Sequence, residues 1–300
     1  MRLVLLAWCA GTAAACIRGA RAGGAEPVAV FTEAGAAPAL CRPDMAGVPV
    51  HLVAADLVAA DLVAAIGAAC PDLVLVTGWP RRLPASLNDA APLGAINVHP
   101  SLLPRHRGRA PVFWTLLAGD ATTGVTLHRL EPDLDAGPIV LQRALVVPAR
   151  ATSASLEPVL DALAGELVAN LCRLDTARRT AIPQQGTPSH APAPTPGDGV
   201  LHWTDPAVDL DRRIRACDGA IEATASYQGM KLVVLASDPR TARSTAPPGT
   251  IVSIELEAIV VSTADGQLAL QRFAFLHRTW PAGELAQELR LEPGAVLDAI

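Results

Sequence analysis

An asparagine and a histidine two residues apart mark the first place in this chain where side chains could do acid–base chemistry. Asn97 and His99 follow the apolar residues Ala95 and Ile96, and Pro100 comes directly after them. Alternate residues of a β-strand point to the same face, so an amide and an imidazole would lie together where the strand ends. In an open α/β sheet, ligands bind at the ends of strands. Such a pair can stabilise an oxyanion and move a proton, although capping of the next turn is the alternative.

The residues that follow favour a site over a simple strand end. Residues 101–104 read Ser-Leu-Leu-Pro and lead into Arg-His-Arg-Gly-Arg-Ala-Pro, a loop with three arginines that proline and glycine confine. The run at 124–128 predicts another short strand, and Asp135 stands two residues before Gly137. Asp135 taken alone is interpreted as a turn aspartate, because aspartate is common before glycine in loops.

Taken together, these segments resemble the formyltransferases that use 10-formyltetrahydrofolate, such as the methionyl-tRNA, glycinamide ribonucleotide and sugar-amine formyltransferases. That family shares an asparagine, a histidine two residues later, a Ser-Leu-Leu-Pro loop and an aspartate in a Leu-Asp-x-Gly segment. Here the matching positions are Asn97, His99, residues 101–104 and Asp135 before Gly137. The resemblance is dense over residues 70–145 and continues more weakly to the C-terminus.

The resemblance implies a catalytic trio of Asn97, His99 and Asp135. His99 would stabilise the oxyanion and return a proton to the leaving folate nitrogen, while Asn97 would donate a second hydrogen bond. Asp135 would orient His99 or a bridging water, and its charge would favour the imidazolium. His106 and His128 are interpreted as surface or structural residues. The sequence contains no spacing typical of a metal site, and the chemistry needs no metal.

The resemblance also implies that 10-formyltetrahydrofolate, the co-substrate, binds beside two loops. The loop after residues 73–76 would offer backbone amides and carbonyls to the pterin ring, and the loop after His99 would form the opposite wall. The tryptophan and arginines of the first loop could equally be surface residues. The residues expected to bind the co-substrate are Gly78, Trp79, Arg81, Arg82, Leu83, Ser101, Leu102, Leu103, Pro104 and Gly137.

A parallel sheet is the element that would position these residues. Helix-like segments separate several of the apolar runs, and the clearest of them covers residues 56–69. This alternation predicts the α/β class with an open, mostly parallel, Rossmann-like sheet, the formyltransferase fold. A long helix at 152–173, capped by Ser153 or Ser155, would close this part. The runs expected as strands are 3–6, 28–31, 48–52, 73–76 and 95–98.

The second half of the chain has a different pattern. A segment rich in proline and glycine predicts a linker at 183–200, between a catalytic domain at 1–182 and a C-terminal domain at 201–300. His190-Ala191-Pro192 resembles the Tyr-Ala-Pro element with which the family's linker wraps back over the first domain. After a helix at 207–217, five β-like runs predict a small OB-like β-barrel.

Composition and the N-terminus bear on compartment and partners. The net charge of −5 argues against a strongly basic nucleic-acid surface. The six scattered cysteines are typical of small buried side chains in a reducing compartment. Residues 1–16 resemble a short signal peptide, but a buried strand at 2–6 also reads as continuously apolar, and we favour it. No stretch is long enough for a membrane span, so a cytoplasmic protein without a membrane partner is expected.

The primary-amine acceptor stays open, because the chain departs from the family's pattern in several places. A Gly-Thr-Pro-Glu-Phe turn is replaced by Ala-Trp-Cys-Ala-Gly-Thr at 7–12, and Arg42 is the only basic residue between 32 and 47. These changes favour a small-molecule, sugar-nucleotide or carrier-bound amine in a biosynthetic pathway. The alternative is initiator methionyl-tRNA, which the two-domain layout favours. A catalytically inactive folate-binding relative is a third interpretation, opposed by the intact trio.

Overall fold

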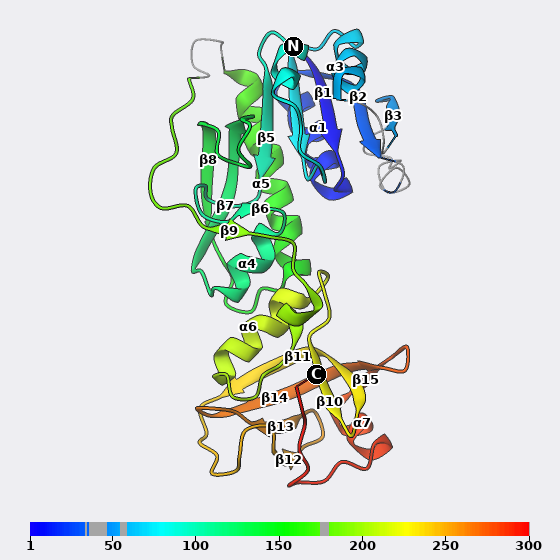
Figure 1. The fold of residues 1–300 in the computed structure, drawn as a ribbon, viewed down its shortest axis with the longest axis vertical. Coiled ribbons are helices and arrows are strands. Elements are labelled where there is room, and N and C mark those ends of the chain that lie inside the picture. The colour runs from blue at the N-terminus through cyan, green and yellow to red at the C-terminus, as the bar shows by residue number, and fades with distance from the viewer. Residues whose placement is uncertain (34, 36–46, 55–58, 175–179, 300) are drawn as a thin grey trace. The chain divides into compact units, whose positions relative to one another are not determined.

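The computed structural model describes residues 1–33, 35, 47–54, 59–174 and 180–299 (Figure 1). The chain forms two compact units. The first comprises Met1–Pro111, Thr122–Val147 and Leu156–Pro192, and the second comprises Val112–Ala121, Pro148–Ser155 and Ala193–Ile300. Residues 183–192 of the expected linker therefore belong to the first unit.

The first unit is built on a seven-stranded sheet with the order β3-β2-β1-β4-β5-β7-β8. The strands from β3 to β5 are parallel, and β7 and β8 are antiparallel to their neighbours. This is the open, mostly parallel sheet that the sequence predicts. The strands are β1 (Arg2–Ala7), β2 (Glu26–Glu33), β3 (Val50–Val53), β4 (Leu73–Thr77), β5 (Ala95–His99), β7 (Thr122–Arg129) and β8 (Ile139–Val146).

The apolar run at the N-terminus forms the buried strand β1, between β2 and β4. Its alternate side chains serve two faces of the sheet. Val4 and Leu6 pack with Leu62 and Ile66 of helix α3 (Ala59–Ala68) in one apolar core. Helix α1 (Ala10–Ala22) contacts β1 and β2, and its own buried side chains lie outside that core. The expected start of the α3 helix at residue 56 lies outside the described residues.

Helix α5 (Ser153–Arg173) packs closely against α1. A Cβ atom on Gly19 would lie 2.0 Å from the backbone oxygen of Gly165, so only glycine permits this approach of the two helices. The expected cap needs correction, because Thr152 occupies the capping position. Its hydroxyl accepts the N–H of Ser155, and the hydroxyl of Ser155 accepts the N–H of Thr152. The hydroxyl of Ser153 instead donates to the backbone oxygen of Ala216.

Shorter elements complete the first unit. A two-stranded parallel sheet joins β6 (Arg107–Gly108) to β9 (His190–Ala191). The linker thus returns to the first unit, as the resemblance of residues 190–192 implied. The short helix η2 (Ala85–Ala90) follows β4. Helix α4 (Pro111–Leu117) follows β6, and all of its residues except Pro111 belong to the second unit.

The second unit holds a six-stranded antiparallel sheet with the order β10-β11-β14-β13-β12, and β15 also pairs with β14. Residues near the C-terminus bridge both edges, through Asp298 to Ser226 and through Val296 to Thr250. Bridged edges are typical of barrels, and the expected OB-like domain is confirmed with one more strand than the five expected runs. The elements are η4 (Pro196–Gly199), α6 (Ala207–Cys217), β10 (Thr224–Tyr227), β11 (Met230–Arg240), β12 (Ile251–Ile254), β13 (Ile259–Ser262), β14 (Gln267–Phe275), β15 (Arg278–Pro281) and α7 (Ala282–Glu288).

Among the helices of the described residues, none is long and apolar enough to cross a membrane. Arg42, the basic residue singled out in the sequence, lies outside the described residues.

Candidate active site

The end of strand β5 carries the polar side chains that the sequence predicts to be catalytic. Asn97 and His99 are separated by one residue on this strand, and both contact Asp135, as their expected common face requires. Strand β7 is antiparallel to β5, and its register places His128 opposite Asn97. Asp135 lies in the loop between β7 and β8. Strand pairing and one loop therefore bring together groups that are 38 residues apart.

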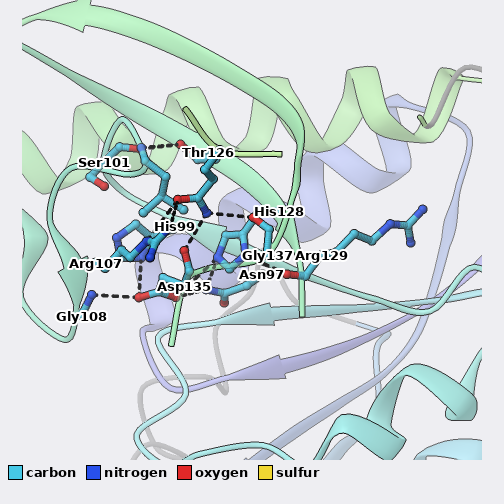
Figure 2. A network of polar contacts seen from close by, with 12 residues as sticks. Asn97, His99, Ser101, Arg107, Gly108, Thr126, His128, Arg129, Asp135 and Gly137 are labelled. Carbon is cyan, nitrogen blue, oxygen red and sulfur yellow. Dashed lines mark hydrogen bonds and ion pairs between the residues drawn. The ribbon is translucent and has the colours of Figure 1, made fainter. Parts of the chain in front are cut away.

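The three side chains form a polar network in which His99 and Asp135 are buried and Asn97 is half-buried (Figure 2). The Asn97 amide donates over 3.1 Å to Asp135 Oδ1, and Asp135 Oδ2 lies 3.6 Å from His99 Nδ1. The backbone N–H of Gly108 donates to Asp135 Oδ2 over 2.8 Å. The other ring nitrogen of His99 donates to the backbone oxygen of His106 over 2.9 Å. The side chains of His99 and Asp135 are 5% and 6% exposed, so water screens their interaction little.

His128 extends this network from strand β7. Its Nδ1 lies 2.9 Å from the backbone oxygen of Arg129, which can only accept, so we assign the proton to Nδ1. Its Nε2 then accepts a hydrogen bond from the Asn97 amide over 3.1 Å. One hydrogen of the Asn97 amide therefore points at Asp135 and the other at His128.

Burial and charge set the protonation of the pair. Burial lowers the pKa of His99, and the carboxylate of Asp135 only partly opposes this. For Asp135, burial alone would raise the pKa, but His99, His128 and the N–H of Gly108 together lower it to about 2. At neutral pH the network thus contains a neutral imidazole beside an ionised carboxylate.

Two family models match the chain. The model described as "Formyl transferase" matches residues 3–170. The model described as "Formyl transferase, C-terminal domain" matches residues 195–285. The first match alone covers more than half of the chain. The chain belongs to the formyl transferase family. The family resemblance drawn from the motifs is thereby confirmed.

Curated relatives and solved structures agree with this assignment. Methionyl-tRNA formyltransferase from Roseiflexus castenholzii is 36% identical over 232 residues, which are 75% of this chain and 72% of the relative. The protein of the same name from Nitratidesulfovibrio vulgaris is 38% identical over 202 residues, 65% of this chain and 61% of the relative. HypX from Aquifex aeolicus, in complex with tetrahydrofolic acid, superposes with a TM-score of 0.65 at 19% identity. That superposition covers 96% of this chain and 47% of HypX, and it supports the fold.

In this formyl transferase, residues 101–104 form a loop that strand β7 fixes. The hydroxyl of Thr126 donates to the backbone oxygen of Ser101 over 2.6 Å and accepts the N–H of Leu103 over 3.2 Å. The hydroxyl of Ser101 donates to the backbone oxygen of Arg105. Ser101 and Leu103 are buried, while Leu102 and Pro104 are half-buried. Folate contacts of these residues stay a prediction.

The second loop expected to bind folate follows β4. Because Thr77 pairs with Val98, Gly78 lies beside the end of β5. Gly78 adopts a positive φ of 60°, which favours glycine. The side chains of Trp79 and Leu83 pack against the core that contains α3. Arg82 is exposed, and Arg81 pairs with Glu33 over 2.5 Å and lies 5.8 Å from the centre of the Trp79 ring.

Gly137 has a structural reason to be glycine. A Cβ atom there would lie 1.9 Å from the backbone oxygen of Arg129. The loop of Asp135 therefore approaches strand β7 more closely than any side chain would permit. A direct contact between Gly137 and folate stays a prediction.

Sequence reasoning missed three residues of this network. His106 and His128 are 6% and 2% exposed, so of the two interpretations, surface or structural, the surface one is wrong and the structural one agrees with their burial. The pairing of His128 with Asn97 follows from strand register, which neither strand's own sequence reveals. Gln184, from the expected linker, contacts the Asp135 loop, and only the position of the returning chain brings it there. Within the part of the chain that the structure describes, no cluster of three or more His, Cys, Asp or Glu side chains is arranged to hold a metal.

Proposed function

We propose that this protein is an N-formyltransferase that moves a formyl group from 10-formyltetrahydrofolate to a primary amine. The observation that carries the proposal is the convergence of Asn97, His99 and Asp135 in one polar network at the end of β5. The family of the chain and the tetrahydrofolic acid bound by HypX support a folate donor. The donor would supply an activated formyl group, and the loops at residues 78–83 and 101–104 are the proposed binding segments.

The geometry suits each step of such a transfer. The amine attacks the formyl carbon, the bond from that carbon to the folate nitrogen breaks, and one proton moves from the amine to that nitrogen. A neutral His99 can take up the amine proton, and the carboxylate of Asp135 stabilises the resulting imidazolium from 3.6 Å. Asn97 donates to the developing oxyanion by exchanging its hydrogen bond to His128 for one to the substrate.

Two acceptors follow from different observations. Relatives named methionyl-tRNA formyltransferase make the amine of methionyl-tRNA the first acceptor to test. The preference for a small-molecule or carrier-bound amine has no specific support from the relatives. It retains one argument, because residues 193–300 contain 9 Lys or Arg against 14 Asp or Glu. An acidic segment is poorly suited to phosphate contacts, which supply much of the affinity for nucleic acids.

A panel of acceptors separates these two proposals. Initiator methionyl-tRNA, free amino sugars, sugar nucleotides with an amine and carrier-bound amino acids are each incubated with 10-formyltetrahydrofolate. Release of tetrahydrofolate is followed in each reaction. Turnover with methionyl-tRNA alone would exclude the small-amine acceptor, whereas turnover with a small amine alone would exclude the tRNA.

A cytoplasmic location is also part of the proposal. The cysteines among the described residues, which are Cys9, Cys16, Cys70, Cys172 and Cys217, form no disulfide bond with one another, and reduced cysteines suit a reducing compartment.

A further inference from the structure

Residues 182–191, here called the return segment, run along the active-site loops, and all but the first of them belong to the expected linker. The return segment begins with a bridge from Ile182 to Ile139 of β8, and it ends as strand β9 beside β6. Strand β6 contains Gly108, whose N–H holds the carboxylate of Asp135. Figure 2 shows Gly108 and Asp135 beside His99. The return segment therefore borders residues that contact the catalytic trio.

Gln184 of the return segment holds the backbone of the Asp135 loop. Its amide nitrogen donates to the backbone oxygen of Asp135 over 2.7 Å and to that of Gly137 over 2.8 Å. Its oxygen accepts two hydrogen bonds from the guanidinium of Arg107, over 2.6 and 3.1 Å. The side chain is thus fixed at both ends, so its amide hydrogens are directed at the loop.

The loop benefits from such support, because Asp135 has a φ of +53°. This left-handed conformation costs free energy for any residue with a Cβ atom, less for aspartate than for most, so contacts with the surrounding chain help to hold it. The conformation aims the carboxylate at His99 and at the N–H of Gly108. The hydrogen bonds from Gln184 to the backbone oxygens of Asp135 and Gly137 stabilise the loop conformation that orients the carboxylate.

Ser189 supports the other catalytic side chain in a similar way. Its hydroxyl accepts the N–H of His106 over 2.9 Å, and His106 also has a positive φ, of 59°. The backbone oxygen of His106 in turn accepts the hydrogen bond from His99. The return segment therefore contacts the backbone supports of both His99 and Asp135.

We propose that Gln184 is a positioning residue for formyl transfer and that the return segment, with Ser189, is part of the active site. This inference rests on the proposed function, because Gln184 would affect formyl transfer only through Asp135. Gln184 touches none of the reacting groups itself. It acts by orienting the Asp135 carboxylate towards His99. The titratable groups that face His99 are Asp135, His128 and His106.

Three variants separate positioning from simple anchoring of the chain. Gln184→Ala removes every contact of the side chain. Gln184→Glu keeps the shape and an acceptor for Arg107, but it can no longer donate to the two backbone oxygens at neutral pH. Gln185→Ala is the matched control, because Gln185 is an exposed glutamine one residue away.

The expected result is a fall in kcat of about 10- to 100-fold for both Gln184 variants, with KM for the donor nearly unchanged. Gln185→Ala should match the wild type, and thermal melts check that each variant folds. Because the Asp135 carboxylate raises the pKa of His99, Gln184→Ala should move the acid limb of the kcat profile to lower pH. Combined with Asp135→Asn, Gln184→Ala should cost little more, since it acts through that carboxylate.

The outcomes distinguish the inference from the proposed function. Retention of at least one third of kcat by either folded Gln184 variant would overturn the positioning role. Full additivity with Asp135→Asn would overturn it as well. NMR titration of the His99 ring in wild type and Gln184→Ala needs no turnover. A lowered pKa of His99 in the variant supports positioning, and an unchanged pKa contradicts it. The failure of every amine to be formylated would refute only the proposed function.

Discussion

Replacement of Asp135 by asparagine is the perturbation that tests the proposed chemistry most sharply. The variant keeps the size of the side chain but removes its charge. In the wild type both carboxylate oxygens accept a hydrogen bond, one from Asn97 and the other from Gly108. In the variant an amide nitrogen, which donates, replaces one of these oxygens. The substitution therefore disturbs the orientation of the side chain at position 135 and abolishes its electrostatic stabilisation of a His99 imidazolium.

The size of the effect follows from the distance between His99 and Asp135. Two unit charges about 4 Å apart interact by about 4 kcal/mol at an effective dielectric constant of 20. Both side chains are buried, so this value needs no large reduction for screening by water. Since about 1.4 kcal/mol corresponds to a tenfold change in rate, kcat should fall roughly a thousandfold.

The assay follows release of tetrahydrofolate at saturating donor and acceptor, over a range of pH. Because Asp135 raises the pKa of His99, any residual activity should have its acid limb at lower pH than in the wild type. Circular dichroism establishes that the variant is folded. A folded Asp135→Asn protein with a kcat within tenfold of the wild type would refute the catalytic role of this carboxylate.

Four further predictions address the site and the two units. His99→Ala should lose nearly all turnover while the affinity for folate, measured by calorimetry, stays within a few-fold; wild-type rates would remove His99 from the mechanism. Gly137→Ala should lower the free energy of unfolding by about 1–3 kcal/mol in denaturant titrations, because its Cβ would overlap the oxygen of Arg129. Asp211→Ala should destabilise the protein by about 3–5 kcal/mol, since this carboxylate is 2% exposed and ion-paired; a smaller change than 1 kcal/mol would contradict this. The pKa of Asp135 is lowered to about 2, so its contribution to stability should be present above pH 4 and lost as the pH falls towards 2, and Asp135→Asn should flatten that part of the pH–stability curve.

Local patterns in the sequence predicted those parts of the fold that depend on local rules. The two-residue period of a strand placed Asn97 and His99 on one face, and both contact Asp135 in the structure. The three- to four-residue period of apolar side chains predicted the helix at residues 56–69, of which α3 covers Ala59–Ala68. Strand β8 was missed because Gln142 and Arg143 interrupt its apolar run, and both are exposed at the edge of the sheet.

The contacts that the sequence did not reveal depend on pairing between distant segments. The proximity of His128 to Asn97 is set by the register of β7 against β5. The hydrogen bonds from Gln184 to the Asp135 loop join residues 49 and 47 positions apart. Neither relation leaves a periodic signal in the chain, so a structure is needed to find them.

Transfer of a labelled formyl group to an amine is the reaction that defines an N-formyltransferase. The protein is incubated with 10-formyltetrahydrofolate that carries an isotopically labelled formyl group and with the panel of amines, and the products are analysed by mass spectrometry. We expect one labelled formyl group on the nitrogen of one acceptor, formed by the wild type and not by His99→Ala. Label transfer at equal rates by both proteins, or release of labelled formate without any formylated amine, would contradict the proposed function.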